Sequence, residues 1–279
     1  MNDARSKTLI TVDELVRLLD AQKAIVLLDV IGEQGAAPED RPKIPGSLSV
    51  HLATDFSSKP TLASGKRPLP NMLELQSKVR AWGICGDSIV VVYDNSGGKQ
   101  ASRAWWTLRW AGLANVRVLD GGYGAWTAAS RLSSNHIATR AACAGDVVLT
   151  TGCMPTIDAE EAADLATQSK LLDARPRAAY VGDPDKEGAG HIPGAIHAPS
   201  GDNIADRKFK PNDDLRVRFS RLGADGSTKI GVYCGSGNAA AHAIAAMCSV
   251  GLEAALYVGS WSAWTADASR PVATGPEPG

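Results

Sequence analysis

The sequence lacks an apolar run long enough to cross a membrane. Runs such as residues 89–92 are far shorter than the roughly 20 residues that a spanning helix needs, and residues 1–7 are too polar for an export signal. An excess of charge of one sign is also absent, because 29 Lys and Arg stand against 30 Asp and Glu. We therefore expect no membrane or nucleic-acid partner, and an anionic ligand must be bound by local groups.

Cysteines at metal-binding or redox spacing are absent as well. The chain has an odd number of cysteines and no CxxC motif; they are Cys85, Cys143, Cys153, Cys234 and Cys248. This pattern argues against a disulfide framework and against a zinc site. A reducing cytoplasm is the location that fits it best, and we expect no bound metal.

Nucleotide-binding motifs are missing too. There is no G-x-G-x-x-G, and neither residues 97–99 nor the loop after Cys234 completes a Walker motif, so we expect no cofactor. What is present is 44% hydrophobic and 21% charged residues, which is typical of a soluble globular protein with a substantial core. A length of 279 residues fits one large domain or two ordinary ones.

An internal duplication indicates two domains. Landmarks of the first half recur in the same order in the second, with offsets of about 140 residues. They are a helix start (11–15 and 156–160), a buried strand ending in an acid (24–29 and 171–173), an Ile-Pro-Gly turn (43–46 and 191–194), a β-branched strand entering a small-residue loop (88–94 and 229–234) and a Trp-containing segment (118–126 and 256–264). We expect a capping box at the first helix start and none at the second.

The repeat predicts an α/β protein of two tandem domains, residues 1–147 and 148–279. Strands that alternate with helical stretches imply a mainly parallel sheet with helices on both faces in each domain. Residues 130–154 read as the linker, with one short strand expected around 147–149. Ligands of such sheets bind beyond the carboxyl ends of the strands.

The two halves differ at the junction of strand and loop, where the first has Asp94 and the second has Cys234. The second alone has a nucleophile there. The loop Gly235-Ser236-Gly237 and the helix after it offer backbone N–H groups and a positive dipole end, which stabilise a thiolate or persulfide. A small buried structural cysteine is the alternative, and from the local sequence both interpretations stay open.

Several motifs together carry a family resemblance. They are Ser102-Arg103-Ala104-Trp105-Trp106, Leu119-Asp120-Gly121-Gly122, Leu172-Asp173-Ala174-Arg175, His191-Ile192-Pro193-Gly194-Ala195, the Cys234 loop and Gly259-Ser260-Trp261-Ser262-Ala263-Trp264. Over nearly its whole length the chain resembles the two-domain rhodanese-type sulfurtransferases, most of all the 3-mercaptopyruvate branch. The resemblance implies two rhodanese-like domains, of which the first is catalytically silent and has Asp94 in place of the cysteine.

The resemblance also implies a double displacement. Cys234 takes a sulfane sulfur from a small anionic donor, 3-mercaptopyruvate or thiosulfate, and passes it from a persulfide to a thiol, cyanide or carrier-protein acceptor. The residues expected to hold the persulfide or substrate are Gly235, Ser236, Gly237, Asn238, Ala239, Ala240, Arg175 and Arg177. Because the loop is neutral after the cysteine, 3-mercaptopyruvate is the favoured donor.

Some positions depart from the family pattern. Asn238 and Ala239 replace a Val-Thr pair, and Ala179 stands where the family has a substrate-binding arginine. Arg177 or Lys186 is a candidate to compensate for that arginine, whereas we expect Arg175 to hold the loop scaffold. A carboxylate donor without a bidentate arginine binds less well.

These departures keep other functions in view. A cysteine-dependent phosphatase or arsenate reductase needs an arginine six residues after the cysteine, and Ala240 occupies that position. A pathway-dedicated persulfide carrier with another donor would explain the missing arginine. A degenerate, non-enzymatic rhodanese-like binding module is the remaining alternative, and the retained Cys234 argues against it.

Overall fold

The computed structural model divides into two compact units by its contacts. It describes the chain except residues 1–2, 33–40, 135–140, 142, 184 and 187. The N-terminal unit comprises Met1–Ser58, Leu69–Met154 and Asp206–Lys208, and the C-terminal unit comprises Lys59–Pro68, Pro155–Ala205 and Phe209–Gly279. The boundary between residues 147 and 148 stays a prediction.

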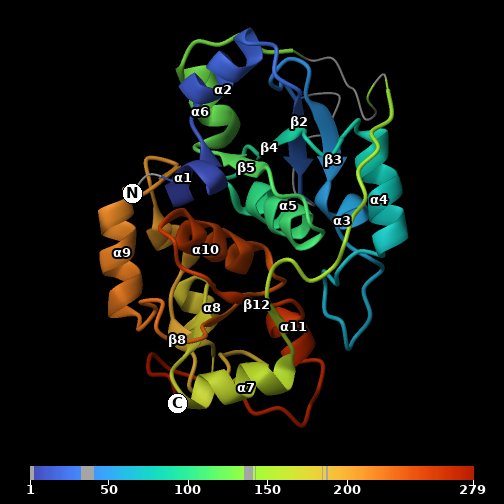
Figure 1. Ribbon diagram of the computed structural model, residues 1–279. Helices are drawn as coiled ribbons and strands as arrows, with labels where there is room; N and C mark the ends of the chain where they lie inside the picture. Colours follow the sequence, from blue (N-terminus) through green and yellow to red (C-terminus); the bar gives the residue numbers. More distant parts are fainter. Residues whose placement is uncertain (1–2, 33–40, 135–140, 142, 184, 187) are drawn as a thin grey trace. The chain divides into compact units, whose positions relative to one another are not determined.

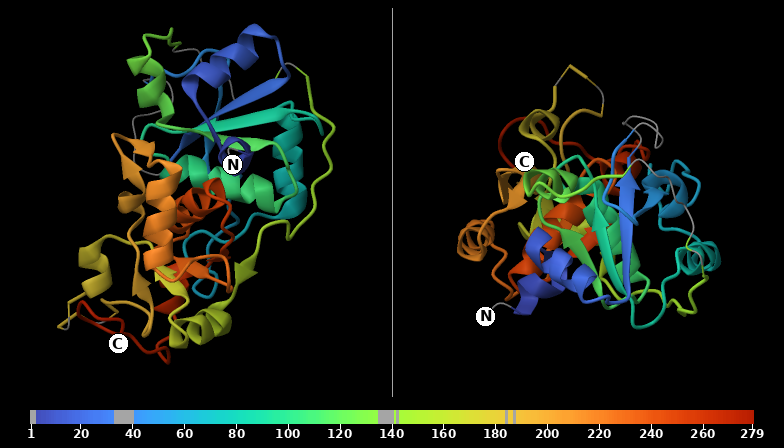
Figure 2. Two further views of the ribbon diagram at one scale, coloured as in Figure 1. Left: turned by 60° about the vertical axis from the view of Figure 1, so that its left-hand side comes forward. Right: turned by 90° about the horizontal axis from the view of Figure 1, so that it is seen from above.

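The N-terminal unit is built on a five-stranded sheet in the order β1-β5-β4-β2-β3 (Figure 1). All neighbouring strands are parallel. The strands are β1 (Leu9–Ile10), β2 (Ile25–Ile31), β3 (Leu48–His51), β4 (Ile89–Tyr93) and β5 (Val116–Leu119). The helices are α1 (Asp3–Thr8), α2 (Val12–Asp20), α3 (Leu52–Asp55), α4 (Met72–Ala81), α5 (Lys99–Trp110) and α6 (Gly122–Ala128). They lie on both sides of the sheet (Figure 2).

The C-terminal unit repeats this plan with a parallel sheet in the order β6-β12-β11-β7-β8. Its strands are β6 (Thr156–Ile157), β7 (Leu171–Asp173), β8 (Ile196–His197), β11 (Gly231–Tyr233) and β12 (Ala255–Tyr257). Its helices are α7 (Ala159–Thr167), α8 (Arg177–Val181), α9 (Asn212–Arg221), α10 (Asn238–Ser249), α11 (Ser260–Trp264) and the short 3₁₀ helix η2 (Ser200–Asn203). Two further short strands are β9 (Ile204–Ala205) and β10 (Lys208–Phe209).

The predicted α/β class with two parallel sheets is therefore confirmed. β4 and β11 occupy the middle of their sheets because their runs of apolar residues are buried, as parallel strands covered by helices require. In the part of the chain that the structure describes, no helix combines the length and apolar character that a membrane crossing requires.

The helix starts differ from the prediction. At α2, Thr11 accepts a hydrogen bond from the backbone of Glu14, but the Glu14 carboxylate pairs with Arg117 at 2.5 Å. At α7 the strict capping box is present, with Asp158 as the cap and Glu161 returning the second bond. The expectation was wrong in both halves. In the first, Arg117 binds the Glu14 side chain, and in the second, Asp158 and Glu161 form the box.

Two strand predictions also need correction. β2 continues past Asp29 to Ile31, so the first carboxylate lies inside its strand, whereas Asp173 does end β7. Residues 147–149 form no strand. Val147 and Leu149 are buried instead as a coil, in which Arg80 and Gln76 side chains satisfy their backbone.

The segment Lys59–Pro68 belongs to the C-terminal unit, although the first half of the sequence contains it. The backbone N–H of Lys66 donates to Ser262 Oγ at 3.0 Å. Gly65 has φ +73°, and a Cβ there would lie 2.5 Å from Gly259 O. Only glycine fits this close approach to α11, so the segment is tied to the end of the unit that contains Cys234.

Candidate functional site

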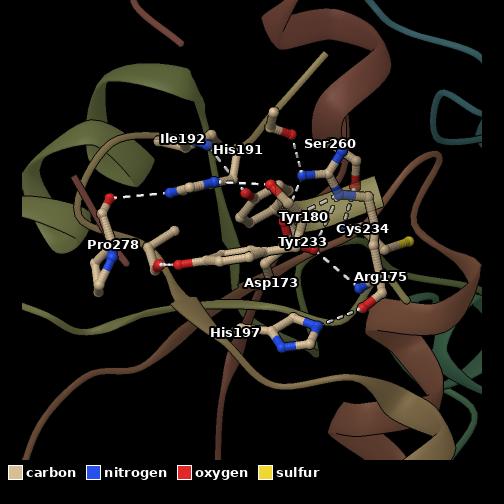
Figure 3. Close-up of polar contacts among 12 residues, drawn as sticks. Asp173, Arg175, Tyr180, His191, Ile192, His197, Tyr233, Cys234, Ser260 and Pro278 are labelled. Carbon is tan, nitrogen blue, oxygen red and sulfur yellow. Dashed lines mark hydrogen bonds and ion pairs between the residues drawn. The ribbon is translucent and has the colours of Figure 1, made fainter. Parts of the chain in front are cut away.

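Cys234 follows β11 directly, at the carboxyl end of the central strand of its sheet. It is 3% exposed. Its backbone is fixed on both sides, because its N–H donates to Ser260 Oγ at 3.3 Å and its carbonyl accepts from Trp261 N at 2.8 Å (Figure 3). Ser260 Oγ in turn donates to Tyr257 O at 2.8 Å. The start of α11 therefore holds the position of the thiol.

The cysteine sulfur faces the beginning of α10. Gly237 N donates to Cys234 Sγ at 3.0 Å, and Gly237 is the N-cap of the helix with φ 90°. Among the described residues, no acceptor is found for the backbone N–H of Ser236, Ala239 or Ala240. These donors and the positive end of the helix dipole favour a negative charge in the loop.

The N-terminal unit has the same loop with its charge already in place. Asp94 Oδ1 accepts from Ser96 N at 2.8 Å and from Gly98 N at 2.9 Å, and Oδ2 accepts from Ala101 N at 2.9 Å. Gly98 is the N-cap of α5, as Gly237 is of α10. The carboxylate thus occupies the anion site that its own loop forms.

Arg175 is held by a buried ion pair rather than directed at a ligand. Its guanidinium contacts both oxygens of Asp173, at 3.0 Å from Nε and 2.5 Å from Nη2, and Nη2 also donates to Gly190 O at 2.7 Å. It lies 4.3 Å from the centre of the Trp261 ring. Burial would lower the pKa of Arg175, but the Asp173 carboxylate reverses this and raises it. The geometry fits the scaffold role that the sequence suggested.

His191 and two tyrosines fix the turn beside this ion pair (Figure 3). The ring of His191 is fully buried; Nδ1 lies 2.8 Å from Tyr180 O and Nε2 lies 3.1 Å from Pro278 O. Tyr233 OH accepts from Ile192 N at 3.1 Å. Burial raises the pKa of Tyr180 to about 12 and raises the pKa of Tyr233 well above its ordinary value. Both tyrosines therefore stay protonated at neutral pH, as structural groups.

Two pockets of the C-terminal unit meet at the loop, and both are lined by Gly235 and Trp261. The first, which we call the Lys66 pocket, has a volume of about 690 Å³ and also contains Ser236 in its wall. The second, the Lys186 pocket, has a volume of about 520 Å³ and includes Ala179. Gly235, which follows the cysteine in the chain, is therefore accessible to small molecules from both pockets, whereas Cys234 is not among the residues that line them.

Some of the predicted ligand-binding residues line one of these two pockets, and others lie outside both. Arg175 and Lys186 line the Lys186 pocket, whereas Arg177 lies exposed at the start of α8 and lines neither pocket. Asn238 is half-buried, and its Oδ1 has no partner among the described residues. Ala239 is half-buried and Ala240 fully buried. An arginine in place of Ala179 would face the Lys186 pocket.

Sequence reasoning missed two groups at this site. Lys66 cannot be predicted from the sequence, because nothing local connects residue 66 with residue 234. Ser260 has the unusual φ of 52°, and its counterpart in the duplication is Gly122 with φ 56°. Because glycine favours positive φ, Gly122 indicates that the corresponding residue after β12, Ser260, is left-handed.

Comparison with known proteins agrees with this geometry. The sequence profile described as the rhodanese-like domain matches residues 11–129 and 158–267. A putative thiosulfate sulfurtransferase, SseB of Mycobacterium tuberculosis, is 39% identical over 98% of this chain and 99% of its own. A probable 3-mercaptopyruvate sulfurtransferase of Pseudomonas aeruginosa is also 39% identical, over 86% of this chain and 87% of its own. The crystal structure of SseA from Escherichia coli superposes with a TM-score of 0.76 at 26% identity, covering 91% of this chain and 98% of that one.

Proposed function

Because this chain belongs to the rhodanese-like family, we propose that it is a sulfurtransferase that carries sulfane sulfur as a persulfide on Cys234. The observation that carries the proposal is the hydrogen bond from Gly237 N to Cys234 Sγ, in a loop with further N–H donors. The two relatives at 39% identity are named as sulfurtransferases of the thiosulfate and 3-mercaptopyruvate types.

The first half-reaction loads the cysteine. The Cys234 thiolate attacks the outer sulfur of thiosulfate, forms an S–S bond and releases sulfite with the electron pair of the broken bond. With 3-mercaptopyruvate the same attack breaks the carbon–sulfur bond, and the enolate that leaves takes up a proton to give pyruvate. In the second half-reaction a thiol, cyanide or carrier-protein acceptor attacks the outer sulfur and restores the thiolate.

The loop amides supply the charge stabilisation. Gly237 N already holds the inner sulfur, and in this proposal the N–H groups of Ser236, Ala239 and Ala240, which have no acceptor among the described residues, donate to the negative outer sulfur. Asp94 supports this assignment, because its carboxylate binds Gly98 N and Ala101 N. These amides stand at the cap and third position of α5, as Gly237 and Ala240 do in α10.

We propose that the protein works in the cytoplasm. Among the described residues no two cysteines form a disulfide, and Cys143 and Cys153 are exposed. Exposed unpaired thiols fit a reducing compartment.

A pathway-dedicated carrier is the second candidate. The observation in its favour is Ala179, since the Lys186 pocket then lacks the guanidinium that would clamp a small carboxylate. A dedicated carrier would take its sulfur from a partner enzyme or a small persulfide. Fast loading from 3-mercaptopyruvate with a low KM would argue against it.

The test is sulfur loading followed by intact mass. Incubation with thiosulfate or 3-mercaptopyruvate should add one sulfur atom to the wild type, and Cys234→Ser should add none. Cyanide should then remove the added sulfur as thiocyanate. The proposal is wrong if no donor loads the wild type, or if the serine variant gains sulfur equally well.

A further inference from the structure

The Lys66 pocket is firmly built. Thr61 and Gly65 form an isolated antiparallel bridge, and Ser64 Oγ accepts from Thr61 N at 2.9 Å. Ser262 then joins this turn to the loop after the cysteine, because its Oγ accepts from Lys66 N at 3.0 Å and its N–H donates to Gly235 O at 3.1 Å. One serine therefore sets the distance between the backbone of Lys66 and the Cys234 loop.

The charge in this pocket has one sign. Lys66 is its lining residue with a formal charge, and no acidic residue lines it. In the described part of the chain, no carboxylate forms an ion pair with the Lys66 ammonium. Two cations line the Lys186 pocket, but each has a carboxylate nearby: Arg175 is paired with Asp173, and Lys186 shares the lining with Asp183. Of the two pockets at the loop, the Lys66 pocket is the one that favours an anion.

The remaining walls restrict which anion fits. Leu62, Pro60 and Trp261 give an apolar side, and Gly235 and Ser236 give the side next to the thiol. A lysine is a single point charge that binds a carboxylate or a sulfonate without demanding a planar fork. The pocket therefore suits a small organic or inorganic anion that binds beside Gly235 and Ser236, the two residues that follow Cys234 in the chain.

We propose that Lys66 binds the carboxylate or sulfonate of the sulfur donor that loads Cys234, and so determines which donors this chain accepts. The inference rests on the proposed function. At position 179 the chain has an alanine, which supplies no positive charge. In this inference Lys66, from the other half of the sequence, supplies that charge. Lys66 is a substrate-binding residue here, and the chemistry stays with the thiol.

The kinetic test compares Lys66→Gln with a matched control and with a variant of the competing pocket. The control, Lys59→Gln, removes a lysine from the same segment outside the pocket, and Lys186→Gln removes the lysine of the other pocket. Lys66→Gln should raise the KM for thiosulfate and 3-mercaptopyruvate about tenfold and leave kcat within about twofold. Lys66→Arg should restore the KM, Lys59→Gln should behave as wild type, and Lys186→Gln should raise the KM less than Lys66→Gln does. If Lys186→Gln raises the KM and Lys66→Gln does not, the inference is overturned.

A second test needs no sulfur transfer. Iodoacetate and iodoacetamide are thiol-alkylating reagents of similar size, and of the two only iodoacetate carries a carboxylate. The ratio of their rates at Cys234, followed by peptide mass, should fall about tenfold in Lys66→Gln and in wild type at high salt. If the ratio is unchanged, Lys66 binds no anion near Cys234 and the inference is wrong. If the ratio falls but no donor loads the protein with sulfur, the anion site stands and the proposed function is wrong.

Discussion

The loops after β4 and β11 form the same structure around different groups. In the N-terminal unit three backbone N–H groups bind the carboxylate of Asp94, and in the C-terminal unit one binds the sulfur of Cys234. A carboxylate reaches further along the loop than a sulfur atom and satisfies more donors. The N-terminal loop is therefore filled by its own side chain, whereas the C-terminal loop keeps N–H groups that have no acceptor among the described residues.

The substitution Cys234→Asp tests the equivalence of the two loops and should have the largest effect. The new carboxylate should accept the Gly237 N–H as Asp94 accepts the Gly98 N–H, and sulfur transfer should fall at least about a thousandfold because the nucleophile is gone. Intact mass and product release measure the loss. Relative to Cys234→Ser, the aspartate variant should melt at a higher temperature, since it caps α10. A lower melting temperature would mean that the two loops are not equivalent.

The next effect concerns the buried ion pair. Arg175→Met should lower the free energy of unfolding by about 3–5 kcal/mol, because it leaves the Asp173 carboxylate buried without its cation. Arg41→Met removes the matching partner of Asp29 in the N-terminal unit. It should cost less, because the Arg41 side chain is 17% exposed against 7% for Arg175. Denaturant unfolding measures both, and an equal loss in the two variants would contradict the comparison.

A smaller effect is expected from Asp94→Ala. The substitution removes the acceptor of three backbone N–H groups at the start of α5, and we expect a loss of about 2–3 kcal/mol. Asp94→Asn keeps one acceptor oxygen and should lose less. Sulfur loading at Cys234 should be unchanged in both variants, and a strong loss of loading would show that the Asp94 loop takes part in the reaction.

The smallest effect is a pH dependence at Asp29. Burial raises the pKa of Asp29 above its usual value, while Arg41 and Lys43 lower it less. A native carboxyl with a raised pKa stabilises the fold below the unfolded pKa, and this contribution is lost as the pH rises through the native pKa. Asp29→Asn should therefore gain stability relative to wild type between acidic and neutral pH. Urea unfolding at several pH values tests this, and a relative loss on raising the pH would contradict the sign.

The local pattern of the sequence predicted the strands and the cysteine loop well. Runs such as residues 89–93 are apolar and β-branched, so they become the central strand wherever helices cover the sheet. The capping box was misplaced, because Glu14 bonds to Arg117, which lies 103 residues away. The strand expected at residues 147–149 does not form, because the side chains of Arg80 and Gln76, and no neighbouring strand, bond to the backbone there.

By itself, the sequence determined the duplication, the two parallel sheets and the contrast between Asp94 and Cys234. These features depend on neighbours in the chain and on a periodicity that repeats. Two features depend on the tertiary structure. Arg175 donates its hydrogen bonds to Asp173 and Gly190, and Lys66 lies beside the loop that follows Cys234. Lys66 and Ser262 are separated by 196 residues. No local preference encodes such a contact, since it exists only when the C-terminal unit has folded and brought the two segments together.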